Sequence, residues 1–317
     1  MIAALERDLE VGRDAVYRRM RGDTALTAAE YVHLTDRYAV NGTPRSATPQ
    51  ERTLPILHYP AGLTSYTDEV SYMRDLRNAT NEIVNLPGVT IDYATPELSL
   101  FYELSPPLLR KFKLFIYSIM TWNVPKMRNA RFSPRLIDPE VDPYIDAIIG
   151  DAYNIPGREI WSIGILDITL RQISYVVEVG RMEESSLVDR LFEELYGIVD
   201  HLERMAQAGR RFPQGQEARQ DSPAFVVYHN ELSNTNNNIL VKSSQGRILF
   251  STLINPNYIT TTDDVVCDDV QNWFESMMSK SNILNSSSAK YSTIYFNTLR
   301  QQLDNRRNAL KTGIDVF

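Results

Sequence analysis

The sequence predicts a mainly α-helical protein with a small antiparallel β segment near residues 224–262, which is an α+β fold class. Apolar residues recur at helical spacing over most of the chain before residue 213. Short β-branched and aromatic runs, separated by Asn-rich and Ser-Gln-Gly turns, follow after residue 224. At 317 residues the chain exceeds the usual size of one domain, so we expect two or three domains.

The first elements are short helices. Residues 2–11 carry apolar side chains at helical spacing and are followed by Gly12. The next pattern, Arg13–Arg21, places Val16 and Met20 on one face, which we expect to point inward. Gly22 follows this pattern, and glycine is the residue that most often ends a helix.

A third helix is predicted to begin after Thr27. Glu30 lies three residues beyond Thr27, and this pair has the spacing of a capping box, in which each side chain bonds the other residue's backbone. The composition then changes to Gly, Thr, Pro, Ser and Asn, which is typical of a linker. We therefore expect a helix-turn-helix segment at residues 1–41 and a linker at residues 42–62.

The remainder predicts a helical body at residues 63–213 and a strand-containing region at residues 214–317. Helical patterns in the body lie at residues 65–86, 108–122, 139–153, 157–179 and 184–208. The segment 89–104 is β-branched and aromatic, and is either a strand or a buried irregular stretch. Strand-like runs of the last region lie at residues 225–232, 239–242 and 248–254, and two helices at about 263–280 and 289–311 close the chain.

Composition excludes several classes of protein. The chain is 43% apolar and 23% charged, so it is not a disordered polyelectrolyte. No run approaches the roughly 18 apolar residues of a membrane span, and acidic residues near Met1 are atypical of a secretory signal. A single cysteine, Cys267, fits a reducing compartment, so we expect a cytoplasmic protein without membrane partners. The net charge of −7 argues against nonspecific wrapping of nucleic acid.

A search for enzyme chemistry finds no catalytic constellation. The four histidines, which are His33, His58, His201 and His229, lack the spacing of metal ligands. Cys267 lies in an acidic stretch, which raises rather than lowers a thiol pKa. The acidic pairs at 263–264 and 268–269 are better explained as complements to a helix dipole than as a cation site. We expect no catalytic residue, no metal and no cofactor.

The helix predicted at Arg13–Arg21 carries the strongest functional signal. Arginine is the commonest reader of guanine edges, and Tyr and Arg both bind phosphate. The alternative interpretation is a solvated basic face on an ordinary small helical bundle. The polar residues expected on the outward side are Asp14, Tyr17, Arg18 and Arg21.

Three segments, which are Leu5–Val11, Ala15–Asp23 and Leu26–Glu30, resemble lambda-repressor-like helix-turn-helix regulators. They are most similar to a group of bacterial regulators whose recognition segment reads Tyr-Arg-Arg-Ile-Arg-Gly-Glu. This resemblance implies a transcription regulator that binds double-stranded DNA, and it places Arg13, Asp14, Tyr17, Arg18 and Arg21 on the recognition helix. Such domains normally begin with one further helix, so we expect either an upstream start or an incomplete DNA-binding unit.

We therefore expect a one-component regulator whose body senses a small-molecule or protein effector and forms a homodimer. The last helix places Tyr291, Tyr295, Leu299 and Leu303 on one stripe, which is either core or a dimer face. Aromatic residues of the body, among them Trp122, Trp161, Trp273 and Tyr175, are more often core than the lining of a ligand pocket. The alternatives are a protein-interaction module with a vestigial helix-turn-helix, and a small-molecule enzyme.

Overall fold

The computed structural model describes residues 2–38, 57, 66–122, 124–231 and 236–312. The chain divides into two compact units, a small unit (Met1–Ile56) and a large unit (Leu57–Phe317), and each is described by itself.

The described part of the small unit holds the helices α1 (Ile2–Asp8), α2 (Arg13–Arg21) and α3 (Ala28–Tyr38). Helix α2 ends at Gly22, whose φ of 79° is left-handed and therefore suits a residue without Cβ. The predicted capping box is confirmed. The Thr27 backbone N–H donates to Glu30 Oε2 at 2.8 Å, and the Glu30 N–H donates to Thr27 Oγ1 at 3.2 Å.

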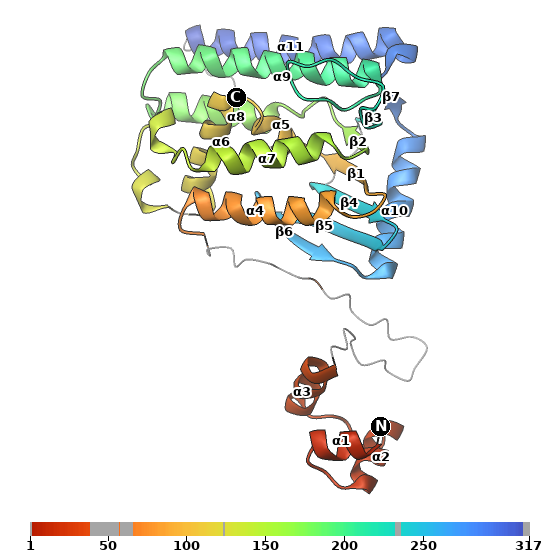
Figure 1. The fold of residues 1–317 in the computed structure, drawn as a ribbon. Coiled ribbons are helices and arrows are strands. Elements are labelled where there is room, and N and C mark those ends of the chain that lie inside the picture. The colour runs from red at the N-terminus through yellow and green to blue at the C-terminus, as the bar shows by residue number, and fades with distance from the viewer. Residues whose placement is uncertain (1, 39–56, 58–65, 123, 232–235, 313–317) are drawn as a thin grey trace. The chain divides into compact units, whose positions relative to one another are not determined.

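The large unit is built on one mixed sheet, to which seven strands of the described residues contribute in the order β6-β5-β4-β1-β2-β3-β7 (Figure 1). Its centre is parallel, with β1 paired to β2 and β2 paired to β3. The flanking pairs are antiparallel. The strands are β1 (Thr90–Thr95), β2 (Gly157–Trp161), β3 (Phe225–His229), β4 (Asn238–Ser243), β5 (Gly246–Ile254), β6 (Asn257–Thr261) and β7 (Asn282–Ile283).

This sheet overturns the expected fold class. The large unit is an α/β fold with a parallel centre, and not a mainly helical body followed by a small antiparallel segment. The expected helix at 157–179 is wrong in its first part, because β2 precedes α8 (Asp167–Glu178). Strand β2 places the charged residues Arg158 and Glu159 before the apolar Ile160 and Trp161, and each charged residue has its partner elsewhere in the chain. Residues 63–213 and 214–317 therefore contribute strands to the same sheet.

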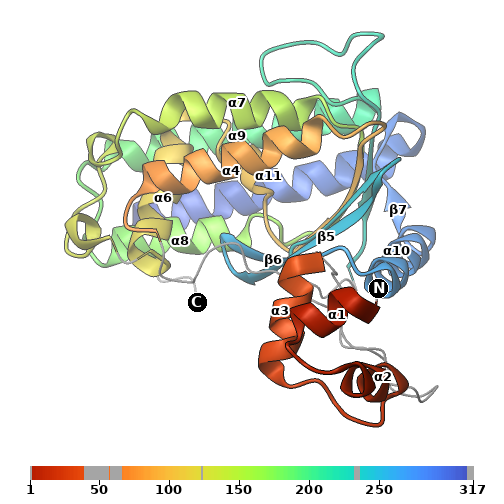
Figure 2. The ribbon, with the colours of Figure 1, turned by 60° about the horizontal axis from the view of Figure 1, so that its bottom comes forward.

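Helices cover both faces of the sheet, unequally (Figures 1 and 2). Helix α10 (Asp264–Ser279) packs on one face, where its Cys267 and Phe274 meet Ile160 and Leu240. The other helices gather on the opposite face in a larger core. They are α4 (Glu69–Val84), α5 (Leu100–Glu103), α6 (Pro107–Met120), α7 (Val141–Tyr153), α8, α9 (Ser186–Ala208) and α11 (Ala289–Thr312).

Most of the aromatic residues expected in the core are there. Trp122 and Trp161 are buried, whereas Tyr175 is exposed and is no part of the core. The stripe on α11 is also core, because Tyr295, Leu299 and Leu303 are buried in the same cluster as the residues of α9. This stripe is therefore covered within the chain and does not supply a dimer face.

Candidate functional site

The outer face of α2 is the first candidate site. The five residues expected to contact DNA are all exposed, and these are Arg13, Asp14, Tyr17, Arg18 and Arg21. Val16 is buried on the opposite side, as expected. The prediction for Met20 is wrong, because this side chain is 50% exposed. The inward face of α2 is therefore narrower than its apolar pattern indicated.

Ion pairs hold the small unit together around this face. Arg19 donates through Nη2 to Glu30 Oε1 at 2.8 Å, which ties α2 to α3. Asp8 is buried, and its carboxylate pairs with Arg37 at 2.9 Å, which ties α1 to α3. Arg19 thus has a structural partner, although it lies between the exposed arginines in the sequence.

The exposed arginines differ in how far they are engaged. The guanidinium of Arg13 lies 6.0 Å from the ring centroid of Tyr17, at the limit of a cation–π contact. Arg21 pairs with Asp23 at 2.9 Å, and both side chains are exposed. An exposed pair of this kind contributes at most about 1 kcal/mol, so the Arg21 side chain can exchange this partner for another anion at little cost.

The second candidate site lies in the large unit, just beyond the carboxyl end of β1. Strand β1 has the parallel strand β2 on one side and the antiparallel strand β4 on the other. The chain returns to the far side of β1 after β3, so this is where the strand order reverses. In open α/β sheets, ligands bind in the crevice outside the carboxyl ends of the strands at such a reversal.

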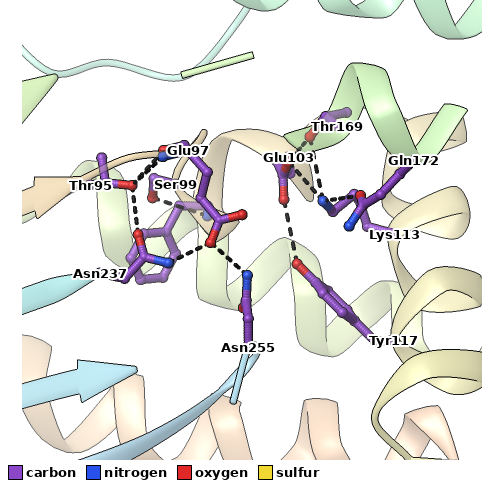
Figure 3. Close-up of polar contacts among 11 residues, drawn as sticks. Thr95, Glu97, Ser99, Glu103, Lys113, Tyr117, Thr169, Gln172, Asn237 and Asn255 are labelled. Carbon is purple, nitrogen blue, oxygen red and sulfur yellow. Dashed lines mark hydrogen bonds and ion pairs between the residues drawn. The ribbon is translucent and has the colours of Figure 1, made fainter. Parts of the chain in front are cut away.

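Glu97 follows β1 at this point, and its side chain is only 5% exposed. Its Oε1 atom accepts hydrogen bonds from the side-chain amides of Asn237, at 2.5 Å, and Asn255, at 2.6 Å (Figure 3). Thr95 orients Asn237 by donating to its Oδ1 atom at 2.6 Å. The Oε2 atom of Glu97 has no hydrogen-bond partner among the residues that the structure describes.

A second buried carboxylate, that of Glu103, lies beside the first and is fully engaged (Figure 3). Its Oε1 atom pairs with Lys113 Nζ at 3.0 Å and accepts a hydrogen bond from the Thr169 hydroxyl. Lys113 is completely buried and also donates to Gln172 Oε1 at 2.7 Å. The charge of Glu103 is therefore compensated directly, whereas Glu97 receives only neutral amide donors.

The environment shifts the protonation of Glu97. Burial raises the pKa of the Glu97 carboxyl above its ordinary value, and the negative charge of Glu103 raises it further. The positive charge of Lys113 and the hydrogen bond from Asn237 act in the opposite direction. Keeping Glu97 ionised in this buried position therefore costs free energy. A cation bound beside its carboxylate would reduce that cost.

A pocket of about 420 Å³ opens beside Glu97. Part of its lining is polar and part is apolar, which is the composition of many small-molecule sites. Met120 is 74% exposed, so the apolar side of the pocket reaches the surface. Lining residues include Glu97, Tyr117, Thr121, Gln172, Ile116, Met120, Ile168 and Leu253.

Sequence reasoning missed Glu97, Asn237 and Asn255. Glu97 lies within the segment 89–104 and Asn237 lies in an Asn-rich turn, and neither they nor Asn255 were expected to form a site. The run Asn236-Asn237-Asn238 could have indicated a polar site. One asparagine suffices for most turns, whereas three in a row supply several amide groups.

The remaining sequence candidates have structural roles. Asp263 is the N-cap of α10 and accepts from the Val266 N–H at 3.0 Å, which confirms that this acidic pair begins a helix. Cys267 is buried, and burial raises the pKa of its thiol. Within the described ranges, no group of three or more His, Cys, Asp or Glu side chains could hold a metal ion. Nor does any described helix have the length and apolar character to cross a membrane.

Comparison with known proteins adds no relative: no protein-family model, no curated protein and no solved structure gives a significant match to this chain.

Proposed function

We propose that this chain is a cytoplasmic, sequence-specific DNA-binding transcription regulator. In this proposal α2 enters the major groove of double-stranded DNA and contacts it through Arg13, Asp14, Tyr17, Arg18 and Arg21. The large unit senses an effector, and two copies of the chain bind a near-palindromic site, because the symmetry of a dimer is matched by that of its operator.

The observation that carries the proposal is the composition of the exposed face of α2. All five of its expected contact residues are exposed, while Val16 anchors the opposite side. A helix of nine residues is about 14 Å long, which suits a recognition helix that reaches base edges from one turn or two. The ion pair between Arg19 and Glu30 holds α2 against α3. The exposed face of α2 therefore has a defined position within the small unit.

A specific observation also favours a second function, that of a protein-interaction module. Met20, Tyr17 and Leu26 are exposed apolar side chains in the small unit, where Met20 is half exposed. Exposed apolar groups rimmed by charged residues are typical of protein interfaces. In this alternative the helix-turn-helix contacts another protein and not DNA.

Selection of genomic DNA fragments by the full chain, followed by quantitative binding at several salt concentrations, tests the proposal. We expect Arg18→Ala with Arg21→Ala to weaken specific binding, by about 5- to 150-fold for each arginine that contacts a base. The melting temperature should hardly change, since both side chains are exposed. A loss of phosphate contacts would instead weaken binding to all sequences alike and reduce the salt dependence.

The matched control removes two exposed arginines from the large unit, with Arg135→Ala and Arg219→Ala. This variant loses the same charge, and we expect it to bind the selected fragments as the unchanged protein does. If the unchanged protein shows no sequence-selective, salt-sensitive binding, the regulator proposal is wrong. A protein partner whose capture depends on Met20 would then support the interaction module.

A further inference from the structure

We propose that the pocket beside Glu97 binds a small organic cation, an alkylammonium compound whose ammonium group contacts the Oε2 atom of Glu97. This inference deepens the proposed function by assigning a chemical class to the effector of the large unit. It rests on the proposed function only in treating the bound molecule as a regulatory effector. Binding itself depends on the large unit alone.

Within the described part of the chain, the Glu97 carboxylate lacks a partner on one of its two oxygens. Its Oε1 atom is occupied by Asn237 and Asn255, and its Oε2 atom is buried without a hydrogen-bond partner among the described residues. An ionised carboxylate only accepts hydrogen bonds, so this oxygen requires a donor. A buried charge without a cationic partner is costly, and a ligand that brings the missing positive charge removes that cost.

Other buried carboxylates of the large unit show how this requirement is met elsewhere. Glu159 bonds Arg211 at 2.6 Å and Tyr102 at 2.8 Å through Oε1, and Trp161 at 2.8 Å through Oε2. Glu69 also has one oxygen without a partner, but its other oxygen pairs with Lys126 at 2.8 Å. Glu97 differs from both, because no cation of the described chain forms an ion pair with it.

The described residues leave only one oxygen of Glu97 to bind a ligand, and this limits the chemical class of the cation. A guanidinium group binds a carboxylate best with two parallel hydrogen bonds, and Glu97 has only one free oxygen. An ammonium group is a compact charge that needs no such pair of acceptors. A divalent metal ion would require several oxygen ligands, whereas both asparagines present their amide nitrogens to Glu97. The donor set therefore favours an ammonium group.

One wall of the pocket is apolar. Ile116, Met120, Ile168 and Leu253 contribute apolar surface, and Met120 and Leu253 are more than half exposed. An alkyl chain of several carbons would cover these side chains while its ammonium group lies at Glu97. A volume of about 420 Å³ accommodates a small molecule of this kind.

Calorimetric titration of the full chain with n-hexylammonium tests the proposal, with n-hexanol and hexanoate as probes of equal chain length. We expect n-hexylammonium to bind with one molecule per chain, and n-hexanol and hexanoate to bind at least about tenfold more weakly. The hydroxyl group of n-hexanol can still donate to Glu97 but brings no positive charge, and hexanoate brings a second negative charge beside Glu97. Binding should weaken as the pH falls, because protonation of Glu97 removes the charge that the ammonium group contacts.

The variant Glu97→Gln keeps the size of the side chain and removes its charge. We expect at least a tenfold loss of affinity for n-hexylammonium with no loss of melting temperature, because the variant buries no unpaired charge. Glu82→Gln on the exposed side of α4 is the matched control and should bind as the unchanged protein does. Ile168→Trp fills the pocket and should also abolish binding, although Glu97 remains.

The proposal is overturned if n-hexylammonium binds no more tightly than n-hexanol, or if Glu97→Gln retains full affinity. It is likewise overturned if Mg²⁺ or Ca²⁺ occupies the site and displaces the amine. Amine binding without sequence-selective DNA binding would leave this inference intact and refute the proposed function. DNA binding without amine binding would refute this inference and leave the proposed function intact.

Discussion

His201 should make the stability of the large unit depend on pH in a defined window. Its imidazole lies in α9 and is 4% exposed, edge-on to Tyr153 at a ring distance of 5.8 Å and to Phe212 at 5.3 Å. Neither ring nitrogen makes a hydrogen bond of good geometry with the described residues. Burial lowers the pKa of His201 from 6.5 to about 4, and the backbone of Phe212 offsets part of this effect.

The magnitude follows from the difference between the two states. In the unfolded chain the imidazole takes up a proton as the pH falls below 6.5, whereas in the folded chain it does so only near 4. The unfolded state therefore binds more protons between these values, and the free energy of unfolding falls as the pH falls through this window. The difference between the two pKa values corresponds to a free energy of about 3 kcal/mol, which is present above pH 6.5 and lost below pH 4.

The assay is chemical unfolding at pH 7 and pH 4, followed by tryptophan fluorescence. All three tryptophans lie in the large unit, so the signal reports this unit alone. Carboxyl groups also titrate in this pH window. The pH dependence of the unchanged protein is therefore compared with that of His201→Leu, which lacks the imidazole. This variant should lose about 3 kcal/mol less between the two pH values than the unchanged protein.

His33→Leu, a substitution at an exposed position of the small unit, is the control and should lose as much as the unchanged protein. Equal losses for His201→Leu and the unchanged protein would refute the reasoning, because His201 would then titrate alike in both states.

Three further outcomes are expected. Trp161→Ala should lower the free energy of unfolding by about 3–5 kcal/mol in chemical unfolding, because the indole is fully buried beside Glu159; an unchanged midpoint would contradict its place in the core. Arg211→Met should cost about 3–5 kcal/mol by leaving Glu159 buried without its cation, and Glu159→Gln in the same chain should recover much of the loss. A larger loss in the double variant would show that the pair acts through other contacts. Light scattering should report a mass near twice 36.3 kDa, and a monomer at tens of micromolar would exclude the proposed homodimer.

Helix ends, helices and strands could be predicted from the sequence wherever the residues that determine them lie close together along the chain. Gly22 and the pair of Thr27 and Glu30 mark the ends of α2 and α3 because each acts on backbone groups within a few residues. The helices α4, α6, α7 and α9 have apolar residues at helical spacing. This pattern predicts a helix even when the elements that pack against it are unknown. The strands β3, β4 and β5 are flanked by turns and rich in β-branched residues. All of these are properties of short stretches of chain.

The parallel centre of the sheet was decided by tertiary structure. Strand β2 is only five residues long and includes Arg158 and Glu159, which carry no strong strand signal. Arg158 pairs with Asp92 on β1 at 2.7 Å, and Glu159 pairs with Arg211. The partners that compensate these charges lie more than fifty residues away along the chain. Without them, the charged residues that follow Pro156 resembled the start of a helix.

The same separation hid the pocket. Glu97 meets Asn237 and Asn255 across 140 and 158 residues of chain, so no spacing in the sequence relates them. The sequence determined the exposed polar face of α2, because residues three and four positions apart lie on the same side of a helix. The fold class and the environment of Glu97 were decided by tertiary structure alone, because hydrogen bonds between distant strands and the burial of a charge exist only once the chain has folded.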